Sequence, residues 1–158
     1  MRVTIFTNPE LAEEYVDIHC LEKTDKVRDI EAYITRGREE IHGRLEDQLH
    51  RIPLQDILYF ESVDKKCFAC TPEHAFATEY SLKVLAEQYE AAGFVRISKA
   101  FIVNLYHIDY IKSDFEMRIL AHLDNQEVLV INRSYKRHFQ TCLKRLKEKM
   151  TGGRDGTD

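Results

Sequence analysis

Two cations interrupt the most apolar part of the sequence, residues 94–108, FVRISKAFIVNLYHI. Side chains such as Ile97 and Phe101 are typical of a protein core, whereas Arg96 and Lys99 are difficult to bury without partners. We therefore expect the chain to turn between two buried runs and to bring both cations to the surface at that turn. Such a turn is a candidate binding surface for an anion.

A second concentration of positive charge lies near the C-terminus. The formal net charge is -4, yet residues 133–150 hold 7 Lys+Arg against 1 Asp+Glu. Residues 1–51 hold 8 Lys+Arg against 12 Asp+Glu, so the acidic balance comes mainly from the N-terminal third. The overall charge therefore says little about the partner, whereas this local excess of cations indicates an anionic one.

Cys67 and Cys70 form a Cys-x-x-Cys pair, which can be a redox pair or half of a zinc site. Residues three apart on a strand point to opposite faces, so the two thiols meet one metal ion only if the strand bends. The sequence has no second Cys-x-x-Cys and no His-x-x-x-His to complete four ligands. Metal or thiol chemistry is therefore the minor alternative, and we expect no cofactor and no metal.

Enzymatic activity is not expected from the motifs in the chain. The sequence lacks a glycine-rich phosphate loop, a nucleophile elbow and a paired-histidine zinc motif. We therefore expect a binding protein and not an enzyme.

The composition predicts a soluble protein of the cytoplasm. Of the 158 residues, 44% are hydrophobic, which is enough for a real core. No apolar run approaches the roughly 20 residues of a membrane helix, and the N-terminus lacks the apolar middle of a signal peptide. Four cysteines are too few for a disulfide scaffold. The C-terminal residues 151–158, TGGRDGTD, should be disordered.

Residues 1–38 are expected to form a small α/β unit with a regulatory or oligomerisation role. Alternation of apolar and polar residues predicts short strands at Arg2–Thr7 and Tyr15–Cys20, each with one buried face. Thr24 is a candidate N-cap for a helix that Gly37 ends. The unit should pack on its neighbours or on another copy of itself.

Residues 39–150 are expected to form one mainly β domain. Alternation, apolar runs and turn residues predict short antiparallel strands within 39–45, 48–52, 54–60, 66–70, 75–80, 94–108, 110–113, 117–123 and 127–131. Helical spacing is found only at 82–92, where Ser81 is the candidate cap and Gly93 the stop, and at 134–150.

Five pieces of this domain, taken in order, carry a family resemblance. They are IPLQDILYFES, a β-rich stretch, SLKVLAEQY, FVRISKAFIVNLYHIDYI and a strand pair that ends in VLVINRSYKRHF. In this order and spacing they resemble a LytTR-type DNA-binding domain over about residues 39–147. The resemblance implies a mainly β fold of about ten short antiparallel strands. It also implies that loops, and not a recognition helix, enter successive major grooves of double-stranded DNA.

Members of this family usually follow a phosphoacceptor receiver domain. Only 38 residues precede the matching part, well short of the roughly 100 of a typical domain. The resemblance therefore implies a stand-alone member, and such short members resemble regulators that a membrane-protein partner controls. It also implies that a second protomer binds beside the first on repeated DNA sites.

The resemblance carries base-reading roles over to Cys67, Lys99 and Arg133. An Arg can fork onto guanine O6 and N7, and a Lys can reach the same acceptors or a phosphate. Cys67 departs from the family pattern, because relatives often have a polar base reader there and a thiol donates weakly. Lys65 or Lys66 is then the alternative contact of this loop, through phosphates.

The other candidates for phosphate contacts are Arg96, Ser98, Tyr135, Lys136 and Arg137. Each also has a structural interpretation. An ion pair with Glu61 or Glu79 is the alternative for Arg96, and burial in the apolar stripe of the last helix is the alternative for Tyr135. The lysines of that helix and of the Lys65-Lys66 turn are alternatively a solvated face. Asn104 is expected to be structural, with its amide satisfying a turn.

Two hypotheses follow for the function. In the first, the chain is a sequence-specific transcription regulator that reads repeated promoter sites in double-stranded DNA through loops of the β domain. In the second, the chain is a protein-interaction module that engages a membrane-bound controller, with DNA binding weak or absent. Steep weakening by salt is typical of the first, because phosphate contacts release counterions.

Overall fold

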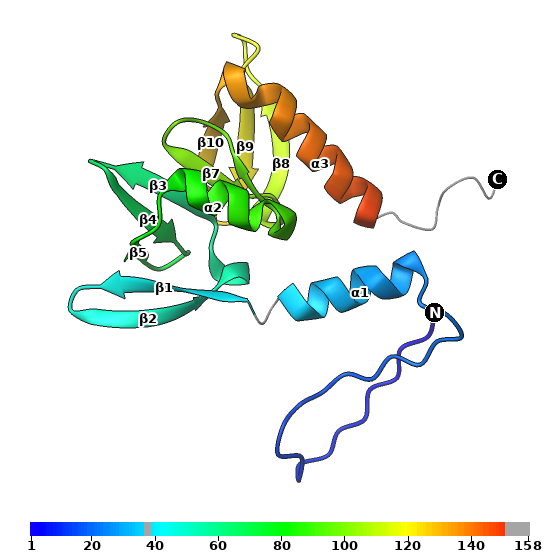
Figure 1. The fold of residues 1–158 in the computed structure, drawn as a ribbon. Coiled ribbons are helices and arrows are strands. Elements are labelled where there is room, and N and C mark those ends of the chain that lie inside the picture. Colours follow the sequence, from blue (N-terminus) through cyan, green and yellow to red (C-terminus); the bar gives the residue numbers. More distant parts are fainter. Residues whose placement is uncertain (37–38, 151–158) are drawn as a thin grey trace, which may run out of the picture.

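The computed structural model describes residues 1–36 and 39–150 and is built on two antiparallel sheets (Figure 1). One sheet has seven strands in the order β2-β1-β5-β4-β3-β7-β6, and the other has three in the order β10-β9-β8. The strands are β1 (Glu40–Leu45), β2 (Gln48–Pro53), β3 (Tyr59–Val63), β4 (Lys66–Cys70), β5 (Ala75–Thr78), β6 (Phe94–Arg96), β7 (Phe101–Asn104), β8 (Ile108–Ser113), β9 (Ile119–Leu123) and β10 (Val128–Ile131).

Three α-helices and four short 3-10 helices complete the fold. They are α1 (Asp25–Arg36), η1 (Leu54–Asp56), α2 (Leu82–Tyr89), η2 (Glu90–Ala92), η3 (Leu105–His107), η4 (Arg133–Tyr135) and α3 (Lys136–Met150). The caps expected from the sequence are confirmed. Ser81 accepts a hydrogen bond from the Val84 amide at 3.2 Å, and Gly93 follows η2 with a φ of 99°, a conformation that favours glycine. The predicted mainly β fold with a C-terminal helix is confirmed.

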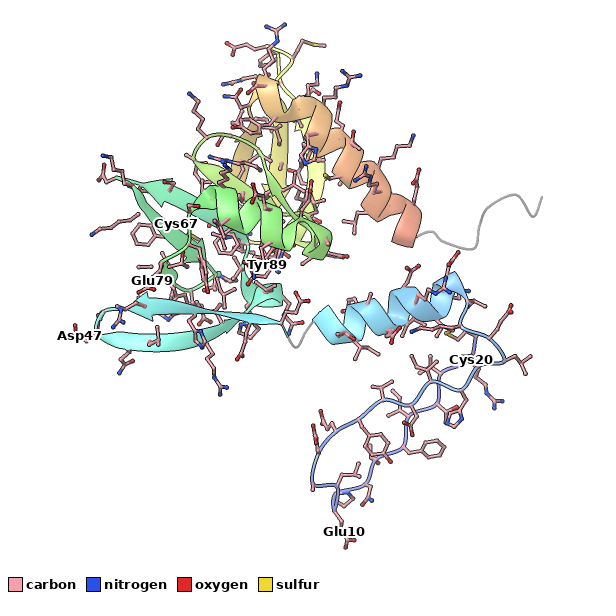
Figure 2. All side chains as sticks on the ribbon, in the orientation of Figure 1. Glu10, Cys20, Asp47, Cys67, Glu79 and Tyr89 are labelled. Carbon is pink, nitrogen blue, oxygen red and sulfur yellow. The ribbon has the colours of Figure 1, made fainter. Side chains whose placement is uncertain are left out.

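The first 24 residues differ from the prediction. The strands expected at Arg2–Thr7 and Tyr15–Cys20 do not form, and α1 is the only regular element among the described residues before β1. The segment is instead an extended arm beyond α1, on which Figure 2 shows Glu10 and Cys20 away from the sheets. Alternation predicts which side chains share a face, but a strand also needs a neighbour for its backbone groups, and within this chain the arm pairs with neither sheet.

The predicted helix of the N-terminal unit does form. Thr24 caps it, because its hydroxyl oxygen accepts a hydrogen bond from the Val27 amide at 3.4 Å. The end expected at Gly37 and the disorder expected of 151–158 lie outside the described residues. None of the described helices combines the length and the apolar character that a membrane crossing requires.

The strands β3 and β7 lie between two hydrophobic cores. Phe60 and Ile102 face one core, which α2 covers, whereas Leu58 and Val103 face the other, which contains residues of the three-stranded sheet and of α3. All four side chains are fully buried. Burial on both faces explains why FIVN at β7 reads as a continuous run rather than an alternating one.

Asn104 is the one buried polar residue among those described, at 2% exposed. Its amide nitrogen donates to the carbonyl oxygen of Ile57 at 2.8 Å, and its amide oxygen accepts from the Tyr106 amide at 3.1 Å, which caps η3. The structural role predicted for Asn104 is confirmed. The side chain joins the end of β7 to the segment that enters β3.

Replacing Asn104 by Ala should destabilise the fold, because the buried carbonyl oxygen of Ile57 and the partly buried amide of Tyr106 then both lose their partner. The expected loss is at least about 2 kcal/mol of unfolding free energy, measured by urea denaturation. Asn132→Ala is the matched control, since Asn132 also accepts a hydrogen bond from the amide two residues on, but it is exposed. Its loss should be about 1 kcal/mol or less. Equal losses for the two variants would contradict the role given to Asn104.

Candidate nucleic-acid interface

The turn of residues 97–100 joins β6 to β7 and is tied to two other loops by main-chain hydrogen bonds. The Ser62 amide, near the end of β3, donates to the carbonyl oxygen of Ala100 at 2.8 Å. The Asn132 amide, just after β10, donates to the carbonyl oxygen of Ile97 at 2.7 Å. The three loops singled out in the sequence therefore belong to one assembly, with the 97–100 turn in the middle.

Arg96 supports this turn from within. Its Nε donates to the carbonyl oxygen of Ser98 at 3.1 Å, and its Nη2 donates to the carbonyl oxygen of Lys99 at 2.8 Å. The ion pair considered with Glu61 or Glu79 is not among the contacts of the described residues. The guanidinium instead donates hydrogen bonds to carbonyl oxygens of the turn that take no part in strand pairing. Its positive charge therefore lies close to Lys99.

Ser98 is also engaged in the turn. Its hydroxyl oxygen accepts hydrogen bonds from the amides of Ala100 at 3.2 Å and Phe101 at 3.0 Å. Lys99 itself is exposed, between neighbours that are held by these bonds. A flexible side chain thus starts from a fixed backbone position, as a contact to a base edge or a phosphate requires.

The hairpin between β3 and β4 carries the next two cations. Val63 pairs with Lys66, and the two residues between them, Asp64 and Lys65, have φ values of 50° and 66°. Two consecutive left-handed residues are typical of a type I′ turn, whose twist matches the flanking strands. Lys65 and Lys66 are both exposed, so the hairpin tip presents two positive charges.

A hollow of about 430 Å³ lies between the first two loops. Lys65, Lys66, Arg96 and Lys99 line it, and so does Lys83 from the first turn of α2. Glu79 also lines this hollow, and it is the one acidic side chain there. The net positive lining of the hollow favours an anionic partner.

Lys83 is a candidate that the sequence analysis missed. It lies within a helical pattern, far along the chain from the other cations, and its exposed face carries no motif. The sequence contained one signal for this role. Lys83 lies two residues after the helix cap Ser81, and a helix N-terminus favours anions.

The burial of Cys67 argues against the base-reading role expected for it. It lines the hollow, but it is 5% exposed and belongs to the core cluster beneath the sheet. Burial raises the pKa of its thiol, and burial raises the pKa of Cys70 to about 12. Both cysteines are free and protonated at neutral pH, so neither is a reactive thiolate.

Arg133 and the start of α3 form the third loop. Arg133 and Arg137 are exposed, whereas Tyr135 and Lys136 are partly buried. The Asn132 side chain caps η4 by accepting from the Ser134 amide at 3.1 Å, which sets the backbone of Arg133 next to the 97–100 turn. Arg133 does not line the hollow, so the candidate contacts form two adjoining groups on linked loops rather than one pocket.

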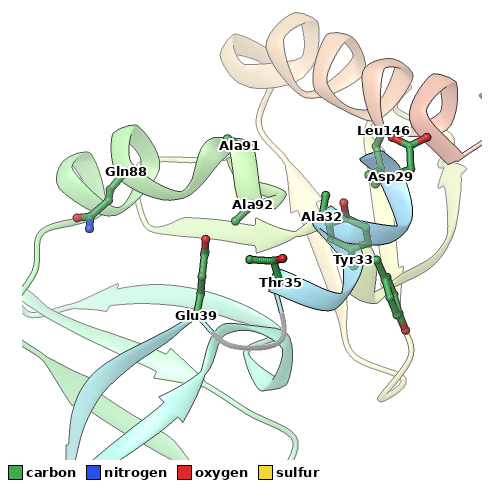
Figure 3. Close-up of a pocket in the computed structure, with 10 residues that line it drawn as sticks. Asp29, Ala32, Tyr33, Thr35, Glu39, Gln88, Ala91, Ala92 and Leu146 are labelled. Atoms are coloured by element: carbon green, nitrogen blue, oxygen red, sulfur yellow. The ribbon is translucent and has the colours of Figure 1, made fainter. Parts of the chain in front are cut away.

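A different hollow, of about 380 Å³, lies where α1 approaches η2 and α3 (Figure 3). Tyr33 and Leu146 are among the residues that line it, and its charged lining residues, Asp29 and Glu39, are acidic. This hollow therefore does not belong to the cationic surface.

Known proteins are similar to this domain in both sequence and fold. Residues 47–144, more than half of the chain, match the LytTr DNA-binding domain family. A LytTr DNA-binding domain from Bacillus cereus is 28% identical in sequence, with a TM-score of 0.63, over 68% of this chain and 98% of that one.

Similar transcriptional regulators come from Staphylococcus aureus. One HTH-type transcriptional regulator of strain NCTC 8325 is 27% identical over 96% of this chain and 99% of its own length. Another, of strain MRSA252, is 30% identical over 69% of this chain and 75% of its own length. The three α-helices of the described residues are separated from one another by strands, so no two of them form a helix-turn-helix. With its β-rich architecture and the match over residues 47–144, the chain belongs to the LytTR family of DNA-binding domains.

Proposed function

We propose that this chain is a sequence-specific transcription regulator that binds double-stranded DNA with the three linked loops. Lys99 and Arg133 are the base-reading side chains of this proposal. The phosphate contacts come from the set Lys65, Lys66, Lys83, Arg96, Ser98, Tyr135, Lys136 and Arg137. The proposal requires no cofactor and no catalytic step, and it places the protein in the cytoplasm, with the DNA.

The observation that carries the proposal is the main-chain linkage of the three loops. The two hydrogen bonds from Ser62 and Asn132 to the 97–100 turn place exposed cations from distant parts of the sequence on one connected surface. An overall charge of -4 does not oppose DNA binding, because each of these loops carries exposed cations of its own. Fixed backbones with cationic side chains suit both phosphate binding and groove reading.

Selection of bound sequences from random double-stranded DNA tests the function directly. An enriched motif that occurs twice at a fixed spacing would support reading of repeated sites by two protomers. A salt titration on the selected DNA should give a log-log slope of about -0.9 for each phosphate neutralised. If no motif is enriched and binding is equal for all DNA, sequence-specific regulation is refuted.

Lys99 and Lys66 have equal charge but different proposed roles. Lys99→Ala should weaken the selected site by about 1 to 3 kcal/mol more than random DNA of the same length, because a base contact is lost. Lys66→Ala should weaken both DNAs about equally and lower the salt slope by about one unit. Fluorescence anisotropy with both DNAs measures these differences.

Lys112→Ala is the control, because Lys112 is exposed on β8 and outside the three loops. The affinity of this variant for both DNAs should equal that of the unmodified protein. An unchanged ratio of selected to random affinity for Lys99→Ala would show that Lys99 reads no base.

The two exposed arginines of the third loop form a second matched pair. Arg133→Ala should relax sequence discrimination and cost about 1 to 3 kcal/mol on the selected site, whereas Arg137→Ala should weaken all DNA alike. Circular dichroism should be unchanged in both variants, since both side chains are exposed. Loss of folding in Arg133→Ala would instead assign that side chain a structural role.

Residues 1–38 are the proposed oligomerisation unit, and the extended arm is its contact surface. Val3, Ile5 and Phe6 are 79%, 83% and 86% exposed, and Tyr15 and Val16 are 68% and 64% exposed. Exposed apolar side chains in this number are costly in water, and alternating extended segments gain backbone partners when they pair with another strand. A second copy of the chain supplies such strands and gives the second protomer on DNA. The membrane-protein controller is the competing occupant of this arm.

A double variant, Ile5→Glu with Phe6→Glu, should therefore convert a dimer of the purified protein into a monomer. Light scattering after size exclusion measures the mass. Leu21→Glu is the control, because Leu21 is also fully exposed but lies outside the two alternating runs, and it should leave the dimer intact. A monomeric unmodified protein would contradict pairing with a second copy and favour a different partner.

A further inference from the structure

Three side chains with metal-binding atoms meet at a point that includes none of the candidate DNA contacts. They are Glu90, at the start of η2, and His138 and Cys142, on α3. One oxygen, one nitrogen and one sulfur atom lie within 4.8 Å of one another. Neither the family match nor any role proposed above accounts for this group.

The helix brings two of these atoms together. His138 and Cys142 are four residues apart on α3 and therefore lie on the same face, one turn from each other. The distance from Cys142 Sγ to His138 Nε2 is 3.6 Å, and from Cys142 Sγ to Glu90 Oε1 it is 3.3 Å. Ligands at the usual zinc distances, about 2.3 Å for sulfur and about 2.0 Å for nitrogen or oxygen, lie about 3.3 to 3.6 Å apart in a tetrahedral site.

The third edge of the triangle is the ion pair of His138 Nε2 with Glu90 Oε1, in which the two atoms are in closer contact than two ligands of one ion would be. Both side chains are partly exposed, at 55% and 41%, so small rotations separate these atoms. Cys142 is 7% exposed and holds the sulfur at a fixed place against the core. The site thus has a fixed sulfur and two ligands that can adjust.

A hollow of about 260 Å³ adjoins the group and is lined by Glu90, Cys142 and Arg145. It provides room for a fourth ligand, either water or an anion that Arg145 attracts. Three protein ligands with one open position are typical of accessible zinc sites, whereas structural zinc sites are closed by four.

We propose that Glu90, His138 and Cys142 form a binding site for a divalent cation of the zinc class. Glu90 Oε1, His138 Nε2 and Cys142 Sγ are the protein ligands, and the thiol loses its proton when it binds the ion. The carboxylate and the thiolate together neutralise the charge of the ion, which permits binding beside the cationic helix α3. A site with nitrogen and sulfur ligands does not favour magnesium or calcium, because these ions prefer oxygen ligands.

The bound ion would connect the end of α2 to α3. The same helix α3 begins with Lys136 and Arg137, so the site fixes the element that carries these candidate phosphate contacts. This makes metal binding a means of setting the orientation of α3, independent of any DNA contact made by the turns.

The test uses untagged, metal-free protein without DNA, so that its outcome does not depend on the proposed function. Zn²⁺ binding is measured by competition with a chromophoric chelator, and Co²⁺ binding by its absorption spectrum. We expect one ion per chain and a thiolate-to-cobalt charge-transfer band. Zn²⁺, and not Mg²⁺, should raise the melting temperature, because an ion that binds the folded state stabilises it.

Glu90→Gln, His138→Ala and Cys142→Ser should each weaken Zn²⁺ binding at least about tenfold, and Cys142→Ser should remove the cobalt charge-transfer band. Glu90→Gln changes an exposed side chain and keeps the fold testable if Cys142→Ser proves unstable. Cys20→Ser is the matched control, because it removes an exposed thiol that follows His19 on the arm. It should bind like the unmodified protein.

Two results would overturn the assignment. One is binding of unchanged strength in Glu90→Gln and Cys142→Ser, which would place the ion elsewhere. The other is the absence of any charge-transfer band and of any rise in melting temperature in the unmodified protein. The group would then be an ion pair with a neighbouring thiol and nothing more.

Discussion

Two main-chain hydrogen bonds hold the candidate DNA surface together, from Ser62 to Ala100 and from Asn132 to Ile97. They connect loops that are separated by tens of residues in the sequence, and each loop follows a strand with buried side chains. Because the bonds use backbone atoms, the geometry of the surface depends on the strands beneath it and not on the exposed side chains. With rigid support of this kind, the residues that stabilise the fold differ from the exposed residues that are available for recognition.

The support itself comes from strands that are buried on both faces. β3 and β7 separate two cores, and Asn104 closes the end of β7 with two hydrogen bonds that no apolar side chain can replace. A displacement of β7 would therefore disturb both cores at once, since close-packed interiors transmit strain. The loop at its other end, residues 97–100, is therefore attached to a strand that cannot shift without disturbing both cores.

Much of this arrangement could be predicted from the sequence, and the remainder depends on distances in space. The prediction of two buried runs within 94–108, with a turn between them, was correct, because apolar side chains next to cations have few alternative arrangements. The contacts of Arg96 with the carbonyl oxygens of Ser98 and Lys99 were not predicted, since a carbonyl of the adjacent turn carries no mark in the sequence. The strands expected within 1–24 failed because alternation does not reveal whether a neighbouring strand exists. Lys83 and Glu90 were missed because folding alone brings them to their clusters.

The hairpin of β3 and β4 has a consequence for how this chain can evolve. Lys65 is exposed with a φ of 66°, a left-handed conformation that costs a residue with a side chain about 1 kcal/mol relative to glycine. Selection for stability alone would therefore replace it with glycine. Selection for affinity to a polyanion would retain the charge. Stability and positive charge therefore place opposite demands on this one position.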